Sequence, residues 1–295
     1  MPIPSLDHPT VYDGSKGTYL TPELLKAGKE ASDVTEWLNL LAPETVAACH
    51  RDYADAGSEV IETNTFNGNR FRLMKYGLGD RVREVNFAAA NIAREVVGPG
   101  VSVAGTIGPS GKLLVIGEVT AEELRDAFAE QAKALAEGGV DFFHVETMAD
   151  LDEAAAAVEG VRSVSDLPVA LTMSFDTGKP EAGLRTMMGV TVAQLVRKAR
   201  EMELFAVGAN CGRGLEGYQT LFRQFVDASP MPLIAKLNAG IPTTVGGETT
   251  YDGTPEKMAE YAEWVARIGV KLIGVCCGGT PRHIEAIARA LSSLR

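Results

Sequence analysis

Short apolar runs alternate with amphipathic stretches along this chain. Eight of the runs have the length and the β-branched composition of strands. They are Thr10 to Asp13, Val60 to Phe66, Val101 to Ile107, Phe142 to Met148, Val169 to Phe175, Ala206 to Asn210, Leu233 to Leu237 and Lys271 to Val275. Because these runs are almost continuously apolar, they are typical of a parallel sheet that is covered by helices.

Between the runs, apolar residues recur every three or four positions, as they do in helices that bury one face. The clearest examples are Ala121 to Gly138, Asp150 to Val164, Val192 to Met202, Pro255 to Ile268 and Pro281 to Leu291. Eight alternating units in 295 residues predict an α/β protein with a single domain, a (β/α)8 TIM barrel over residues 1–295. An open doubly wound sheet is the alternative, but the segment Gly14 to Thr18 lacks the glycine spacing of a phosphate-binding loop.

Composition excludes several kinds of partner. The formal net charge of −11 means that nucleic acid or an anionic membrane surface would repel the chain. No apolar run approaches the roughly 20 residues that span a bilayer. Nothing at the N-terminus resembles a secretory signal. We therefore expect a cytoplasmic protein with no nucleic-acid or membrane partner.

Polar residues follow the predicted strands at their carboxyl ends, where the active sites of barrels of this kind lie. They are Asp13-Gly14, Glu62-Thr63-Asn64-Thr65, Glu146-Thr147, Ser174, Asn210-Cys211, Lys236-Leu237-Asn238 and Cys276-Cys277. Asn64, Asn210 and Asn238 either hydrogen-bond a substrate or satisfy loop carbonyls. We expect His144 to be a hydrogen-bonded core residue. Lys236 has three open roles: an anion anchor, a partner for a buried acid, or the Schiff-base lysine of an aldolase.

Three of the four cysteines, Cys211, Cys276 and Cys277, lie beside glycines at the ends of the sixth and eighth predicted strands. Three thiolates with an open fourth position are typical of a catalytic Zn²⁺ site, and no fourth ligand for a closed structural site is evident. A disulfide is disfavoured because three cysteines cannot pair evenly and vicinal cysteines rarely bond without strain. Simple core packing is the other alternative, and we expect it for Cys49. Adjacent strand residues face opposite sides, so the two glycines after Cys277 would have to bend the backbone.

These motifs resemble the zinc-dependent homocysteine S-methyltransferases, and most of all the homocysteine-binding module of cobalamin-dependent methionine synthase. The resemblance rests on Asp13 to Thr18, on Glu62 to Phe66, and on Cys211 with Cys276 to Thr280. It implies that zinc binds the homocysteine sulfur and that Asp13 and Glu146 hold the amino group. The other substrate-binding residues that we expect from it are Gly14, Thr18, Asn64 and Asn238.

The resemblance implies methyl transfer to the homocysteine thiol, which gives methionine. Zinc would keep that thiol deprotonated, so no general base is needed. Betaine, S-methylmethionine, methylfolate and methylcobalamin all remain open as donors, and other thiols remain open as acceptors. The segment Thr63 to Arg70 favours the methionine synthase branch, whereas Ser15-Lys16 departs from the small-Met pair common in the family. Because the chain ends at Arg295, directly after its eighth predicted helix, we expect a separate corrinoid-binding protein to supply methylcobalamin. An aldolase barrel and a zinc-thiol binding subunit are the alternatives from other classes.

Overall fold

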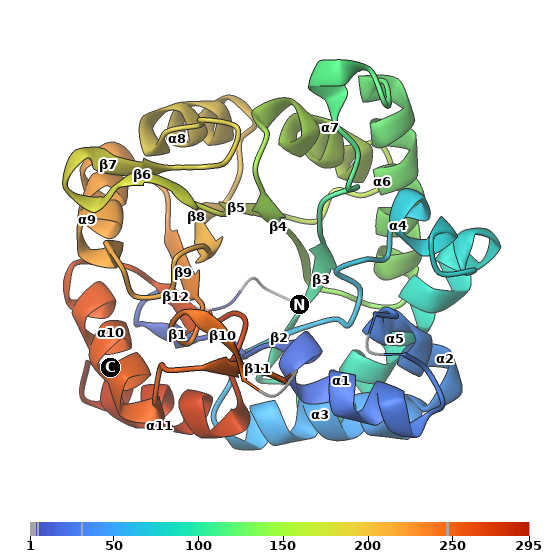
Figure 1. Ribbon diagram of the computed structural model, residues 1–295, viewed down its shortest axis with the longest axis horizontal. Coiled ribbons are helices and arrows are strands. Elements are labelled where there is room, and N and C mark those ends of the chain that lie inside the picture. The colour runs from blue at the N-terminus through green and yellow to red at the C-terminus, as the bar shows by residue number, and fades with distance from the viewer. Residues whose placement is uncertain (1–3, 5, 31, 246–247, 295) are drawn as a thin grey trace.

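An eight-stranded sheet curls into a barrel inside a ring of helices (Figure 1). The computed structural model describes residues 4, 6–30, 32–245 and 248–294. The barrel strands are β1 (Thr10–Val11), β2 (Val60–Glu62), β3 (Ser102–Ile107), β4 (Phe142–Met148), β5 (Val169–Met173), β8 (Ala206–Cys211), β9 (Leu233–Leu237) and β12 (Leu272–Val275). All neighbours are parallel in the order β1-β12-β9-β8-β5-β4-β3-β2, and a bridge between Tyr12 and Val60 joins the two ends. The predicted (β/α)8 barrel is confirmed.

The helices cover the sheet because each buries one apolar face against it. They are α1 (Lys16–Lys26), α2 (Leu38–Leu41), α3 (Pro43–Asp55), α4 (Arg70–Met74), α5 (Val82–Val96), α6 (Ala121–Glu137), α7 (Leu151–Arg162), α8 (Val192–Glu201), α9 (Tyr218–Ala228), α10 (Pro255–Arg267) and α11 (Pro281–Leu291). In α6, Thr120 and Glu123 form a capping box that fixes where the helix begins. The five helices predicted from periodicity are confirmed to within two residues at each end.

The barrel interior is filled in layers that follow the two-residue period of its strands. The lowest layer is apolar and takes one residue from, or directly after, each strand. Its members are Tyr12, Val60, Ala104, Phe142, Ala170, Ala206, Ile234 and Leu272. Two positions further along, the inward residues become polar: they include Glu62, His144, Thr172 and Lys236, all buried. The apolar layer thus closes the bottom of the barrel, and the polar layer forms the floor of its mouth.

Two features differ from the prediction. The second strand was expected to reach Phe66 but ends at Glu62. Thr63 N still donates to Ala104 O (3.0 Å). Beyond that bond, the Thr63 hydroxyl accepts from Thr106 N (3.0 Å) and pairs with the Thr65 hydroxyl (2.6 Å), so side chains take over from the strand ladder. Loops after β5 and β9 also form two hairpins that apolar periodicity did not predict. They consist of β6 (Thr177–Lys179) with β7 (Gly183–Arg185), and β10 (Pro242–Val245) with β11 (Glu248–Tyr251).

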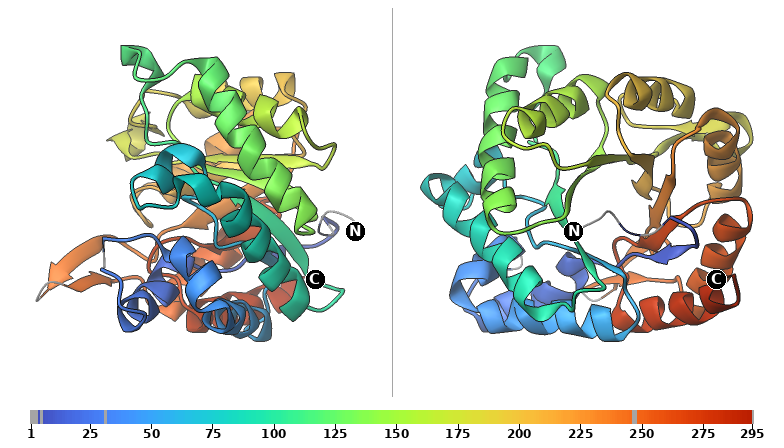
Figure 2. Two further views of the ribbon diagram at one scale, coloured as in Figure 1. Left: turned by 90° about the vertical axis from the view of Figure 1, so that its right-hand side faces the viewer. Right: turned by 180° about the vertical axis from the view of Figure 1, so that it is seen from behind.

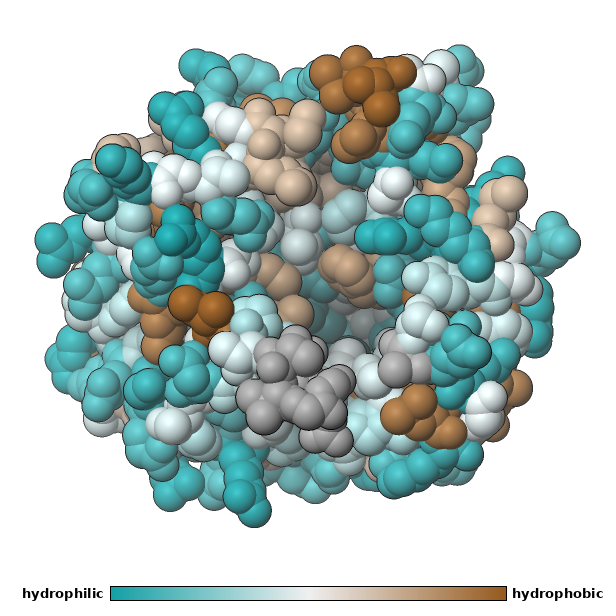
Figure 3. All heavy atoms as spheres, viewed as in Figure 1, coloured by the Kyte–Doolittle hydropathy of each residue, from teal (hydrophilic) through white to brown (hydrophobic). Residues whose placement is uncertain are grey.

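The carboxyl ends of the strands open on the face seen in Figure 1. Figure 2 shows the β10–β11 hairpin projecting from this face, with the N-terminal end of the chain on the opposite side. In Figure 3 the middle of the same face is hollowed. Among the described residues, no helix combines the length and the apolar character needed to cross a membrane.

Candidate metal and substrate site

The three cysteines converge at one wall of the barrel mouth. Cys211 ends β8, and Cys276 and Cys277 directly follow β12. Cys211 Sγ lies 2.8 Å from Cys276 Sγ and 3.9 Å from Cys277 Sγ, and all four cysteines of the chain are free. The backbone achieves this by turning: Cys211 has a φ of 57° and Gly278 a φ of 80°. The bend expected from the glycines is present, and it begins once the strand has ended.

These sulfurs suit a zinc ion by donor type and by spacing. A tetrahedral site with Zn–S bonds of about 2.3 Å places its sulfurs roughly 3.8 Å apart. The Cys211–Cys277 separation is already close to that value, while Cys211 and Cys276 would have to part by about 1 Å. Hydrogen bonds from Cys211 and Cys276 lower the pKa of Cys277 to about 3, so the trio readily holds a thiolate. The three thiols therefore fit zinc and leave a fourth position toward the barrel mouth.

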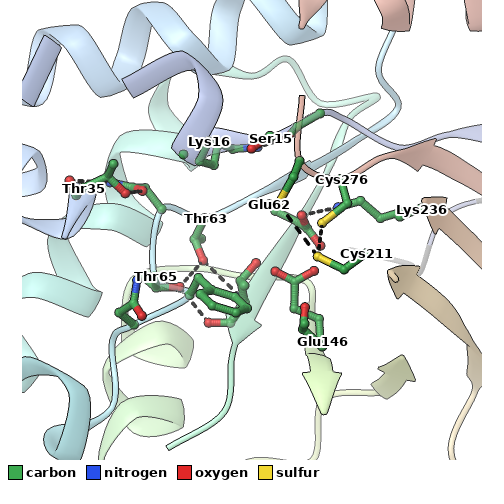
Figure 4. A pocket seen from close by; sticks show the side chains of 18 of the residues that line it. Ser15, Lys16, Thr35, Glu62, Thr63, Thr65, Glu146, Cys211, Lys236 and Cys276 are labelled. Carbon is green, nitrogen blue, oxygen red and sulfur yellow. Dashed lines mark hydrogen bonds and ion pairs between the residues drawn. The ribbon is translucent and has the colours of Figure 1, made fainter. Parts of the chain in front are cut away.

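A pocket of about 180 Å³ occupies that mouth (Figure 4). Its lining residues come from the segment after β1, from the α1–α2 connection, from the end of β2 and the loop after it, and from the ends of β3, β4, β8, β9 and β12. They are Gly14 to Gly17, Thr35, Glu62 to Asn67, Thr106, Glu146, Thr147, Cys211, Lys236 and Val275 to Cys277. A ligand in this pocket would therefore meet the cysteine trio and several charged groups together.

Glu146 is the carboxyl group in this pocket that lacks a cation. Within the described part of the chain, no lysine or arginine lies within ion-pair distance of it. Its Oε2 instead accepts from Asn210 Nδ2 at 3.3 Å. Asn210 also contacts Thr147: its Oδ1 accepts from Thr147 N and its Nδ2 donates to Thr147 Oγ1. Thr147 has a φ of 59°, which is strained for a β-branched residue. Burial and the nearby Glu62 carboxylate raise the pKa of Glu146 well above its ordinary value. Without a ligand the group therefore tends to keep its proton, and a bound cation would favour its ionised form.

Lys236 neutralises the floor of the pocket. Its ammonium pairs with Glu62 and lies 3.5 Å from Asp13 Oδ1, and all three side chains are buried. Burial opposes the charged amine, but the carboxylates outweigh it and raise the pKa of Lys236. A Schiff-base lysine must reach its neutral form, so this ion pair disfavours the aldolase alternative. Of the three open roles, the structure gives Lys236 that of internal partner.

His144 is confirmed as a hydrogen-bonded core residue. Its Nδ1 lies 2.7 Å from Glu62 Oε1 and its Nε2 lies 3.0 Å from Thr172 Oγ1. Sequence reasoning assigned no role to Glu62, which links the histidine to Lys236. The two-residue period was the available signal, because Glu62 lies two positions after the apolar Val60 of the lowest layer.

The expected ammonium partner Asp13 lies behind the pocket wall and is already occupied. Its Oδ2 accepts from Glu62 N at 2.7 Å and pairs with the ammonium of Lys16. The prediction that Asp13 and Glu146 share a substrate ammonium stays a prediction. For Asp13 to take part, Lys16 would first have to move away.

The remaining predicted site residues fall into two groups. Gly14 and Asn64 line the pocket, and a Cβ on Gly14 would lie 2.6 Å from the Tyr53 ring. Thr18 and Asn238 instead support the cysteine turn: Thr18 Oγ1 accepts from Gly278 N (2.9 Å), and Asn238 Oδ1 accepts from Cys277 N (3.1 Å).

Two predicted substrate-binding asparagines, Asn64 and Asn238, use their side-chain N–H groups to hold neighbouring loops. Asn64 Nδ2 donates to Thr35 O and Asn39 Oδ1, and Asn238 Nδ2 donates to Gly212 O. Cys49 is buried in α3, as expected of a core residue.

Three converging thiols at the carboxyl ends of the strands place the donor set of a catalytic zinc site where barrels of this kind carry their active sites. The sequence matches the family model of homocysteine S-methyltransferase over residues 10–291. The chain belongs to this family, and it is an enzyme of the methyltransferase class.

Two curated relatives are methionine synthases. The chain is 30% identical to that of Mycobacterium tuberculosis over 299 residues and 29% identical to that of Mycobacterium leprae over 296 residues. These matches cover 97% and 96% of this chain but only 25% and 24% of the relatives. The chain thus spans about a quarter of the length of the curated relatives that it matches.

Solved structures agree on the fold. The metallated form of the homocysteine methyltransferase MmuM from Escherichia coli superposes with a TM-score of 0.77 at 21% identity, over 96% of each chain. A methyltransferase from Methanosarcina mazei has a TM-score of 0.59 at 14% identity, over 99% of this chain and 95% of the other.

Proposed function

We propose that this protein transfers a methyl group to the thiol of homocysteine, giving methionine, with Zn²⁺ held by Cys211, Cys276 and Cys277. One observation carries the proposal: three free thiols and one cation-free carboxyl group line the same small pocket. Bound zinc would supply the Lewis acidity that keeps the acceptor sulfur in its nucleophilic thiolate form at neutral pH. The proposal makes residues 1–295 a homocysteine-binding domain.

The protein's own groups then position the acceptor. Glu146 receives the substrate ammonium, while Asn210 keeps its carboxylate in place. Lys236 holds Glu62 in an internal ion pair, so that this second carboxylate does not compete for the ammonium. Methyl transfer is a displacement at carbon, so alignment of the acceptor sulfur contributes more than proton transfer does.

Glu146→Gln is expected to weaken homocysteine binding by roughly tenfold or more, because the substitution removes a buried charge partner but keeps the shape of the side chain. Calorimetry on zinc-loaded protein measures the effect. The same titrations in buffers of different ionisation enthalpy should show net proton release, from the thiol as it ionises and from Glu146, whose raised pKa falls when the ammonium binds. Glu84→Gln, on the exposed surface of α5, is the matched control. Unchanged affinity of the Glu146 variant would remove this residue from the ammonium site.

We propose a methyl-corrinoid as the donor, carried by a protein separate from the barrel. The curated relatives are named methionine synthases, and the resemblance of Thr63 to Arg70 to the cobalamin-dependent methionine synthase branch supports this choice. So does the surface around the mouth, where loops after β3, β7 and β9 expose large apolar side chains. They are Leu113, Val115, Ile116, Met187, Met188 and Ile241. Exposed apolar side chains on these loops would suit a protein contact, and the contact would be transient because the carrier must leave to be remethylated.

A donor screen with zinc-loaded protein and homocysteine tests this choice. Free methylcobalamin should support slow methionine formation, accompanied by the colour change of the demethylated corrinoid, and betaine should fail. Protein without added homocysteine serves as the control for spontaneous decay. Rapid turnover with betaine or S-methylmethionine and no corrinoid would contradict the choice of donor, although it would leave the thiol mechanism intact.

A further inference from the structure

The pocket has more carboxyl groups than lysines around it, which matters for a ligand that carries both an ammonium and a carboxylate. Three carboxyl groups surround it, on Asp13, Glu62 and Glu146, together with two lysines, Lys16 and Lys236. Lys236 also lines the pocket, but its side chain is only 2% exposed and its ammonium is held between Glu62 and Asp13. Of the two lysines that line the described pocket wall, Lys16 is therefore the more accessible to a ligand.

Lys16 is held in a position that suits this task. It begins α1, its side chain is 10% exposed, and it lines the pocket. Its ammonium pairs with Asp13, donates to Gly14 O at 3.3 Å and lies 5.0 Å from the centre of the Tyr53 ring. An ammonium group has three hydrogens, so these two acceptors leave one for a ligand.

Lys16 and Glu146 face the pocket from different sides. In Figure 4, Lys16 lies beside Ser15 at the start of α1 and Glu146 lies across the pocket at the end of β4, with Cys211 and Cys276 along the adjoining wall. An acceptor whose sulfur lies at the cysteines would thus have a cation on one side and a carboxyl group on the other. A substrate carboxylate that enters this pocket loses its hydration, so its burial requires a cation.

We propose that Lys16 binds the carboxylate of the acceptor and so selects thiols that carry an acid group. The inference rests on the proposed function. It adds a partner for the substrate carboxylate to the partner already proposed for the ammonium. Asp13 then acts as a positioning residue, because it keeps the Lys16 ammonium at the wall of the pocket.

Three thiols test the assignment by calorimetry on zinc-loaded protein: homocysteine, mercaptobutyrate, which lacks the ammonium, and mercaptopropylamine, which lacks the carboxylate. Lys16→Met should weaken the binding of homocysteine and mercaptobutyrate by about tenfold to a hundredfold. It should leave the affinity for mercaptopropylamine within about twofold of the wild-type value. Glu146→Gln should weaken the binding of homocysteine and mercaptopropylamine and leave the binding of mercaptobutyrate unchanged. Lys26→Met removes an exposed lysine from the same helix and should change none of the three affinities.

Three results would overturn the assignment. If Lys16→Met weakens the binding of all three thiols equally, Lys16 only stabilises Asp13. Tighter binding of mercaptopropylamine would mean that Lys16 competes with the substrate ammonium for Asp13. If the wild-type protein binds none of the thiols, the proposed function itself fails. Should Lys16→Met not fold, Lys16→Gln keeps a hydrogen bond to Asp13 without the charge, and the same three affinities decide.

Discussion

Alanine at Cys211, Cys276 or Cys277 is expected to remove both the bound metal and methyl transfer. Each substitution leaves two thiols, and even changes to groups that merely support metal ligands cost about 10- to 100-fold in affinity. We therefore expect a loss of more than 100-fold in zinc affinity, with about one zinc per chain in the wild-type protein. Metal analysis after competition with a chelator measures the loss, and a methionine assay follows activity.

Cys49→Ala is the matched control for these variants. Cys49 is a fully buried free cysteine in α3 and lies outside the pocket lining. Its replacement removes one core sulfur and should leave zinc content and turnover intact. Full zinc retention in the Cys276→Ala protein would contradict the site as described.

Lys236→Met is expected to destabilise the fold by about 3–5 kcal/mol. Removing one member of a buried ion pair leaves its partner charged and without compensation, and here Glu62 and Asp13 both lose their contact with the ammonium. Urea unfolding measures the free energy, and Lys133→Met on the exposed face of α6 is the control. An effect below about 1 kcal/mol would show that the ion pair contributes little.

A double substitution separates charge from packing at this pair. Glu62→Gln combined with Lys236→Met leaves no carboxylate at position 62, so much of the lost stability should return. Additive losses in the double variant would instead indicate that the lysine stem matters through its packing.

Much of the fold was predictable because its signals are local. Continuous apolar strands, amphipathic helices and their alternation predicted the barrel, and the polar residues at strand ends predicted the face that holds the site. Cys211, Cys276 and Cys277 were also predictable as a group, since the fold rule places the carboxyl ends of all strands at one mouth. The second strand was predicted too long because Thr63 and Thr65 have good strand propensity. In the structure their hydroxyls make contacts that end the ladder.

The sequence by itself thus determined the barrel, the face of the site and the set of thiols. Only the tertiary structure decided which carboxyl group stays free for a substrate. Asp13 and Glu146 are equivalent as acidic residues at strand ends, but Asp13 is paired with Lys16, and Lys236 is paired with Glu62, which is 174 positions away in the chain. The Asp13–Lys16 pair is local, three positions apart, but the Lys236–Glu62 pair depends on which side chains share an interior layer when the barrel closes. No local pattern of residues encodes the Lys236–Glu62 contact, so the full charge balance of the pocket appears only in the folded molecule.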